Sequence, residues 1–166
     1  LIDRAEGWRY LSRLTRAALE QSVESGDPAV PQLYRLSHET IKIGADNPDA
    51  FYQNAIIDGR YDYTLTGTRG TVGYIGIGTY SGVYGLDEKI EQTGFLDLHG
   101  VKGDENGCIT IHISKESKES KEKKPGLWLP MREDTRLLII RQFRMDWEKD
   151  EVAKLEIKCV NAPGRK

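Results

Sequence analysis

Residues 108–114 read Cys-Ile-Thr-Ile-His-Ile-Ser, with isoleucine at every second position. Successive side chains of a β-strand point to opposite faces, so Ile109, Ile111 and Ile113 share one face. Such strict alternation predicts a half-buried strand whose isoleucines enter a core. His112 then lies on the other face, where we interpret it as a surface or groove residue rather than a metal ligand.

Similar short segments recur along the chain after residue 50. They are rich in β-branched or aromatic residues and are bounded by Gly, Asp or Asn, the pattern of strands separated by turns. They cover residues 61–65, 71–79, 94–98, 108–114, 137–143 and 154–160, with weaker candidates at 41–43 and 51–58. Strands that follow one another without intervening helices favour an antiparallel, jelly-roll-like sandwich over a parallel α/β sheet. We therefore expect a mainly β domain over residues 31–162.

Residues 1–30 are predicted to form an N-terminal helix and its connection to this domain. Asp3 and Glu6 have the spacing of a capping box, and a helix over residues 4–25 would end before Asp27-Pro28. The helix is amphipathic, and a helix of this length gains most of its stability from packing. We expect its apolar stripe to pack against the sandwich; the stripe consists of Trp8, Leu11, Leu14, Ala18, Leu19 and Val23.

Residues 114–124 read SKESKESKEKK, which contains no apolar side chain. This composition predicts an exposed, mobile loop within the β-domain. Glutamates alternate with the lysines and no aromatic residue is interleaved, so the segment does not resemble a nucleic-acid-binding stretch.

Charge and hydropathy exclude two classes of partner. The 24 basic and 26 acidic residues give a net charge of −2, which provides no field to attract nucleic acid. No apolar run approaches the eighteen or so residues of a membrane span. The first residues lack the basic and apolar regions of a signal peptide, so we predict a cytoplasmic protein.

The sequence motifs indicate neither a metal site nor a cofactor. His38, His99 and His112 lie far apart, without a metal-ligand spacing. The glycines of residues 76–82 have the spacing G-x-G-x-x-x-G rather than that of a dinucleotide-binding loop. The two cysteines are not spaced as C-x-x-C, and we expect buried thiols.

One polar cluster is denser than its surroundings. Residues 46–49 read Asp-Asn-Pro-Asp, and Tyr52, Asn54 and Arg60 follow. Asx side chains bond the backbone two residues on, which predicts a tight turn. The turn has either a structural use only, or it projects Tyr52 and Asn54 into a cleft.

Two further stretches are candidate ligand surfaces. In residues 128–130, Trp-Leu-Pro, the proline cannot donate to a ladder, which indicates an edge strand or a strand entry. Trp128 is then either a buried cap or a stacking platform. In residues 74–80, alternate glycines flanked by tyrosines could form a shallow trough, unless another element packs on the glycines.

Several short pieces, taken in order, resemble the bacterial domain-of-unknown-function family 1214. They are Gly44 to Asp49 with Tyr52, Asp58-Gly59, Gly67 to Gly70, Gly107 to Ile111, Trp128 to Pro130, and Leu138 to Gln142. The resemblance implies a jelly-roll-like domain that is often one half of a double jelly roll, and it implies no established reaction. This chain has Leu127 where the family usually has Asn.

Two functions remain open at this stage. The first is a non-catalytic binding or assembly module of a larger double-sandwich protein, which forms a homo-oligomer or contacts a second sandwich domain. The alternative is a small-molecule enzyme with its site in a cleft between this domain and a second one. We assign no catalytic residue; the candidate ligand-binding residues are Asp46, Asn47, Asp49, Tyr52, Asn54, Arg60, Trp128 and Arg141.

Overall fold

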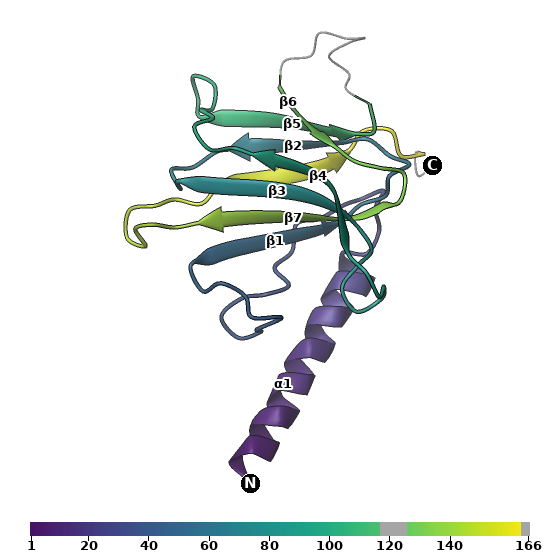
Figure 1. Cartoon of the computed structure of the whole chain (residues 1–166), viewed down its shortest axis with the longest axis vertical. Helices are drawn as coiled ribbons and strands as arrows, with labels where there is room; N and C mark the ends of the chain where they lie inside the picture. The colour runs from purple at the N-terminus through teal and green to yellow at the C-terminus, as the bar shows by residue number, and fades with distance from the viewer. Residues whose placement is uncertain (117–125, 164–166) are drawn as a thin grey trace.

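The computed structural model describes residues 1–116 and 126–163 and consists of two four-stranded sheets and one N-terminal helix (Figure 1). The first sheet has the order β1 (Ala50–Ile56), β7 (Thr135–Phe143), β3 (Tyr74–Ser81) and β4 (Glu91–Asp97). The second has the order β6 (Leu127–Pro130), β5 (Cys108–Ser114), β2 (Tyr63–Thr68) and β8 (Lys154–Cys159). Neighbouring strands are antiparallel, except that β5 and β6 are parallel.

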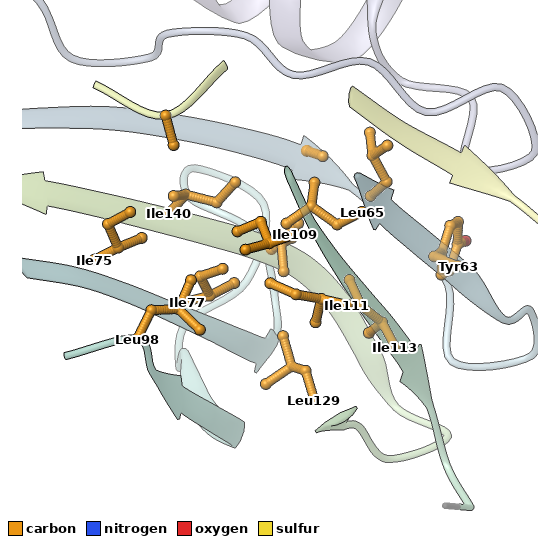
Figure 2. Packing of buried hydrophobic residues seen from close by; sticks show 14 of the residues in the cluster. Tyr63, Leu65, Ile75, Ile77, Leu98, Ile109, Ile111, Ile113, Leu129 and Ile140 are labelled. Atoms are coloured by element: carbon orange, nitrogen blue, oxygen red, sulfur yellow. The ribbon is translucent and has the colours of Figure 1, made fainter. Parts of the chain in front are cut away.

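The main core lies between the two sheets. The three isoleucines of β5 are buried, as their alternation predicted, and they pack with Ile75 and Ile77 of β3 in one cluster (Figure 2). Each sheet therefore contributes one face to a shared apolar layer, the arrangement that defines a β-sandwich. The predicted mainly β sandwich with one N-terminal helix is confirmed.

Four local expectations can be compared with the structure, and one of them agrees with it. Residues 41–43 form no strand, and Ile41 takes part only in an isolated bridge with His38. Residues 128–130, which we placed at an edge or a strand entry, do lie in the edge strand β6. Cys108 and Cys159 are free but only half-buried, because both lie at strand ends. Of the loop predicted at residues 114–124, Ser114 is the buried end of β5, and residues 117–124 lie outside the described residues.

The predicted helix is present as α1 (Ile2–Leu19), continued by a π-helical turn, η1 (Glu20–Glu24). Its N-terminal half projects away from the sandwich (Figure 1). Its C-terminal half packs Ala17 against Tyr34, Leu36 and Ile41 in a second, smaller cluster, which also includes Leu14, Ile43 and Ile56. The helix thus contacts the segment that precedes β1.

The expectation that the apolar stripe of α1 packs on the sandwich is wrong. Trp8 is 64% exposed, Leu11 53% and Leu19 57%. The helix docks through Ala17 and one stripe residue, Leu14, which pack with residues of the segment 34–43 and with Ile56 of β1. Gln21 of η1 is also buried. One apolar side of α1 is left open.

Within the described part of the chain, no helix is both long and apolar enough to cross a membrane.

Candidate functional site

The floor of the candidate site is the outer face of the first sheet. Tyr52 of β1 pairs with Arg141 of β7, and Asn54 pairs with Ile139. Ala55 of β1 and Ile140 of β7 occupy positions that alternate with these residues, and both belong to the main core. Because side chains alternate along a strand, Tyr52, Asn54, Ile139 and Arg141 point away from that core.

Residues 34–49 form a roof over this face. Tyr34 is held at the edge of β1 by two backbone hydrogen bonds with Asn54, of 2.9 and 2.8 Å. Leu36 and Ile41 then pack with Ala17 of α1, and Ile56 of β1 joins this cluster. The roof is therefore anchored both to the sheet and to the helix.

The end of the roof is the turn that the Asp-Asn-Pro-Asp stretch predicted. The Asn47 side-chain oxygen accepts a hydrogen bond from the Asp49 backbone N–H at 2.9 Å. The Asn47 N–H donates to the Tyr52 hydroxyl at 3.2 Å, which fixes that ring beside the turn. Gly44 and Ala45 precede it with φ of 60° and 54°. A positive φ is uncommon for alanine and marks a conformation that the surrounding structure imposes.

Roof and floor enclose a pocket of about 240 Å³. Its lining combines apolar side chains with a carboxylate, an amide, a guanidinium and phenol groups; it consists of Leu36, Ser37, Ile43, Gly44, Ala45, Asp46, Tyr52, Asn54, Tyr84, Ile139 and Arg141. Ligand pockets typically measure about 300–1,000 Å³, so this one suits a molecule smaller than a nucleotide.

The charged groups of the pocket have defined partners. Arg141 Nη1 donates to the Tyr80 hydroxyl at 2.8 Å, and its guanidinium lies 5.7 Å from the centre of that ring. Asp46 Oδ2 lies 3.3 Å from the ammonium of Lys42. Partial burial raises the pKa of Asp46, but hydrogen bonds from Ser37 and Lys42 and the charge of Lys42 outweigh it, and the net pKa lies below its usual value. Asp46 is therefore ionised at neutral pH.

A second pocket of about 230 Å³ lies on the other side of the same turn and includes Asn47 and Asp49 in its lining. Trp147 Nε1 donates to Asp49 Oδ1 at 3.3 Å, and the Arg144 guanidinium lies 5.2 Å from the Trp147 ring. These contacts attach the turn to the segment after β7. Asp46 lines both pockets.

Two candidate residues from the sequence lie elsewhere. Arg60 is exposed in the turn after β1, where its guanidinium pairs with Asp58 at 2.7 Å. Trp128 lies on β6 in the other sheet, and its Nε1 donates to the Ser114 hydroxyl at 3.2 Å. Neither side chain lines the pocket beneath the roof. Trp128 is half-buried at the edge of the sandwich.

The glycine trough predicted on β3 is filled by its own tyrosines. A Cβ added to Gly78 would lie 2.6 Å from the Tyr80 hydroxyl, and one added to Gly76 would meet the Tyr74 ring. Each ring therefore lies across the glycine two residues away on the same face. Because Gly78 has no side chain, the Tyr80 ring can lie flat over it, and in this position the Tyr80 hydroxyl accepts the hydrogen bond from Arg141.

Several lining residues were missed at the sequence level. Ile139 could have been found from strand register, since it faces Asn54 across the sheet. Leu36, Ile43 and Tyr84 come from irregular segments, and no local pattern marks them. Within residues 1–116 and 126–163, no group of three His, Cys, Asp or Glu side chains is arranged to hold a metal ion.

No protein-family model matches the chain, and neither does any curated protein. Among solved structures, an uncharacterized protein from Burkholderia cenocepacia is similar, with 45% identity and a TM-score of 0.88, over 99% of this chain and 44% of that chain. A protein from Vibrio parahaemolyticus is 22% identical with a TM-score of 0.48, over 68% of this chain and 31% of that chain. This chain thus spans less than half the length of each of these two proteins.

Proposed function

We propose that this chain is a binding and assembly domain of a longer, double-sandwich protein, and that the open side of α1 docks the rest of that protein. The observation that carries the proposal is the exposed apolar side of the helix. Trp8, Leu11 and Ala18 follow one another at helical spacing, and the first two are more than half exposed. Contiguous exposed apolar surface on a folded domain is typical of an interaction site.

The occupant that we propose is a second domain of the same polypeptide. The similar Burkholderia cenocepacia protein has more than half of its length outside the matched part, which provides enough chain for such a domain. The side of α1 that faces the roof is already occupied through Leu14 and Ala17. The second domain would then cover the neighbouring side, which carries Trp8 and Leu11.

Four related expectations belong to this proposal. They are membership of domain-of-unknown-function family 1214, jelly-roll-like connections, a double arrangement and a cytoplasmic location. The family resemblance rests on the ordered sequence pieces given above, and the length of the similar protein supports the double arrangement. A homo-oligomer is the competing form of assembly.

The enzyme alternative has less support from the pocket. Its described lining contains one carboxylate, Asp46, which is already paired with Lys42. General acid–base chemistry needs a group positioned to exchange a proton with the substrate. The lining is better suited to holding a ligand by hydrogen bonds and apolar contact, so binding takes precedence.

The test compares two chains: the 166 residues and the longest chain that the native gene encodes. Acrylamide quenching of tryptophan fluorescence is measured for each chain and for its Trp8→Phe variant, so that the difference reports on Trp8 alone. We expect Trp8 to be freely quenched in the 166-residue chain and protected at least severalfold in the longer chain. The Trp147→Phe variant is the matched control, because Trp147 is also exposed but lies away from α1.

Two results would overturn the proposal. One is the absence of added protection: Trp8 is quenched equally in both chains, as it must be if the gene encodes no further domain. The other is protection of Trp8 that appears in the 166-residue chain as its concentration rises, with a matching dimer in sedimentation. That second result would establish a homo-oligomer as the occupant.

A further inference from the structure

The Asn54 side chain is the most unusual group in the pocket. Asn54 is 4% exposed, and its side-chain amide makes no hydrogen bond to any residue in the described parts of the chain. It lines the pocket, and neither of its side-chain polar atoms is sealed off from the space there. Because these polar atoms face the pocket and meet no protein partner, water or a ligand must supply their hydrogen bonds. A bound ligand would supply the missing partner.

Arg141 provides a second donor on the same floor. Asn54 faces Ile139 across the β1–β7 ladder, and Arg141 lies two residues further along the same face. Such diagonal neighbours lie about 7–8 Å apart, within the reach of a long side chain. Arg141 uses Nη1 for the Tyr80 hydroxyl, and no carboxylate of the described residues forms an ion pair with it. Its remaining N–H groups and the Asn54 amide match the two oxygens of a carboxylate.

The roof supplies the complementary group. Asp46 is ionised and can only accept hydrogen bonds; a carboxylate has about four acceptor sites, so it can accept from a donor on the ligand in addition to Ser37 and Lys42. Leu36 and Ile43 of the roof and Ile139 of the floor form an apolar part of the same lining. The pocket thus presents a cation with an amide, an anion and an apolar wall.

We propose that this pocket binds a small aliphatic acid that carries a hydrogen-bond donor beside its carboxylate, as 2-amino and 2-hydroxy acids do. Arg141 and Asn54 hold the carboxylate, Asp46 accepts from the amino or hydroxyl group, and the aliphatic chain lies against Ile139 and Ile43. The volume of about 240 Å³ suits a molecule of this size. This binding is independent of docking at α1, so either proposal can fail without the other.

The test is a titration of the 166-residue chain, labelled with ¹⁵N, with four probes of one carbon skeleton. L-leucine and 2-hydroxy-4-methylpentanoate carry both the carboxylate and the donor. 4-Methylpentanoate lacks the donor, and leucinamide lacks the carboxylate. We expect one or both of the first two probes to shift the Asn54 side-chain NH₂ signals, with at least tenfold weaker binding for each of the others. The stronger of the first two distinguishes an amino acid from a hydroxy acid.

Two variants connect the binding to the pocket. Asn54→Leu keeps the branched shape of the side chain and removes the amide, so binding should weaken at least tenfold while the melting temperature stays equal or rises. Arg141→Gln should weaken binding by a similar factor. Arg136→Gln is its matched control, because Arg136 is an exposed residue of the same strand outside the pocket lining.

The proposal is overturned if neither leucine nor its hydroxy analogue shifts the Asn54 signals. It is also overturned if 4-methylpentanoate or leucinamide binds as well as they do, or if the Asn54→Leu and Arg141→Gln variants bind the probes as tightly as the unchanged chain.

Discussion

Tyr63→Phe removes one hydroxyl group that joins three parts of the chain. Tyr63 is 1% exposed, and its hydroxyl accepts a hydrogen bond from the Asp58 backbone N–H at 2.8 Å. It donates to the Pro28 carbonyl at 3.0 Å. Burial raises the pKa of Tyr63, so the phenol stays protonated and able to donate. The connection after α1, the β1–β2 turn and the main core therefore meet at this group.

Phenylalanine keeps the ring in the core but leaves both backbone groups without this partner. A buried polar group that loses its partner costs about 1–3 kcal/mol. Asp58 and Pro28 are only half-buried, so water repairs part of the loss, and we expect about 2 kcal/mol for the two groups together. In a chain of this length, that free energy corresponds to a fall of about 4–8 °C in Tm.

Urea unfolding followed by far-UV circular dichroism measures the change. The midpoint should fall while the m value stays constant, because the surface exposed on unfolding is unchanged. Tyr61→Phe is the matched control: Tyr61 is half-buried, its hydroxyl forms no hydrogen bond with another described residue, and its removal should change little. Equal stability of Tyr63→Phe and Tyr61→Phe would refute the role assigned to the Tyr63 hydroxyl.

Three further changes test other parts of the structure. Trp8→Ala should lower the free energy of unfolding of the 166-residue chain by about 0.5 kcal/mol or less, since Trp8 is 64% exposed. Urea unfolding measures the change, and a loss as large as that of a buried tryptophan would contradict the open helix face. Gly7→Ala should stabilise α1 by about 0.5–1 kcal/mol, because nothing lies within 4 Å of the added methyl group, and a fall in Tm would argue against this helix. The Arg60 guanidinium, hydrogen-bonded to Asp58, lowers the pKa of that carboxyl, so the pair stabilises the fold above the unfolded pKa of about 3.9 and loses this effect as pH falls through the folded pKa. Unfolding midpoints at pH 7 and below pH 4 should therefore differ less for Asp58→Asn than for the unchanged chain, and parallel pH profiles would exclude the contribution.

The strands could be predicted because alternation is a local signal. Ile109, Ile111 and Ile113 alternate in the sequence and are buried on one face in the structure. The same alternation at Ile41 and Ile43 was misleading, because those residues pack with α1 and the roof rather than in a sheet. Periodicity indicates which side of a segment is apolar, but it contains no information about what covers that side.

The candidate site was predicted only in part, for a related reason. Asp46, Tyr52 and Asn54 are close in sequence and follow a turn that its residue types predict. Arg141 was a candidate only because it lies in one of the pieces that resemble the family. In the structure, the β1–β7 register places it opposite Tyr52. The roof residues Leu36 and Ile43 could not be found, since the chain reversal over the sheet depends on tertiary contacts. Arg60 follows the same cluster in sequence, but it lies beyond the opposite end of β1, where it pairs with Asp58.

The small size of the cluster around Ala17 and Ile41 predicts that it opens at a lower free energy than the core between the sheets. It buries only four apolar side chains, whereas the cluster between the sheets buries many more. Segments with few buried contacts exchange their amide hydrogens through local opening at a lower free energy than global unfolding. Leu36 belongs to this weaker unit and Ile139 to the strands beneath it, and both face the same pocket. The pocket therefore lies between these two units, and we expect residues 34–43 to open more readily than the strands, which would admit a small solute to the pocket while the pairing of the strands stays intact.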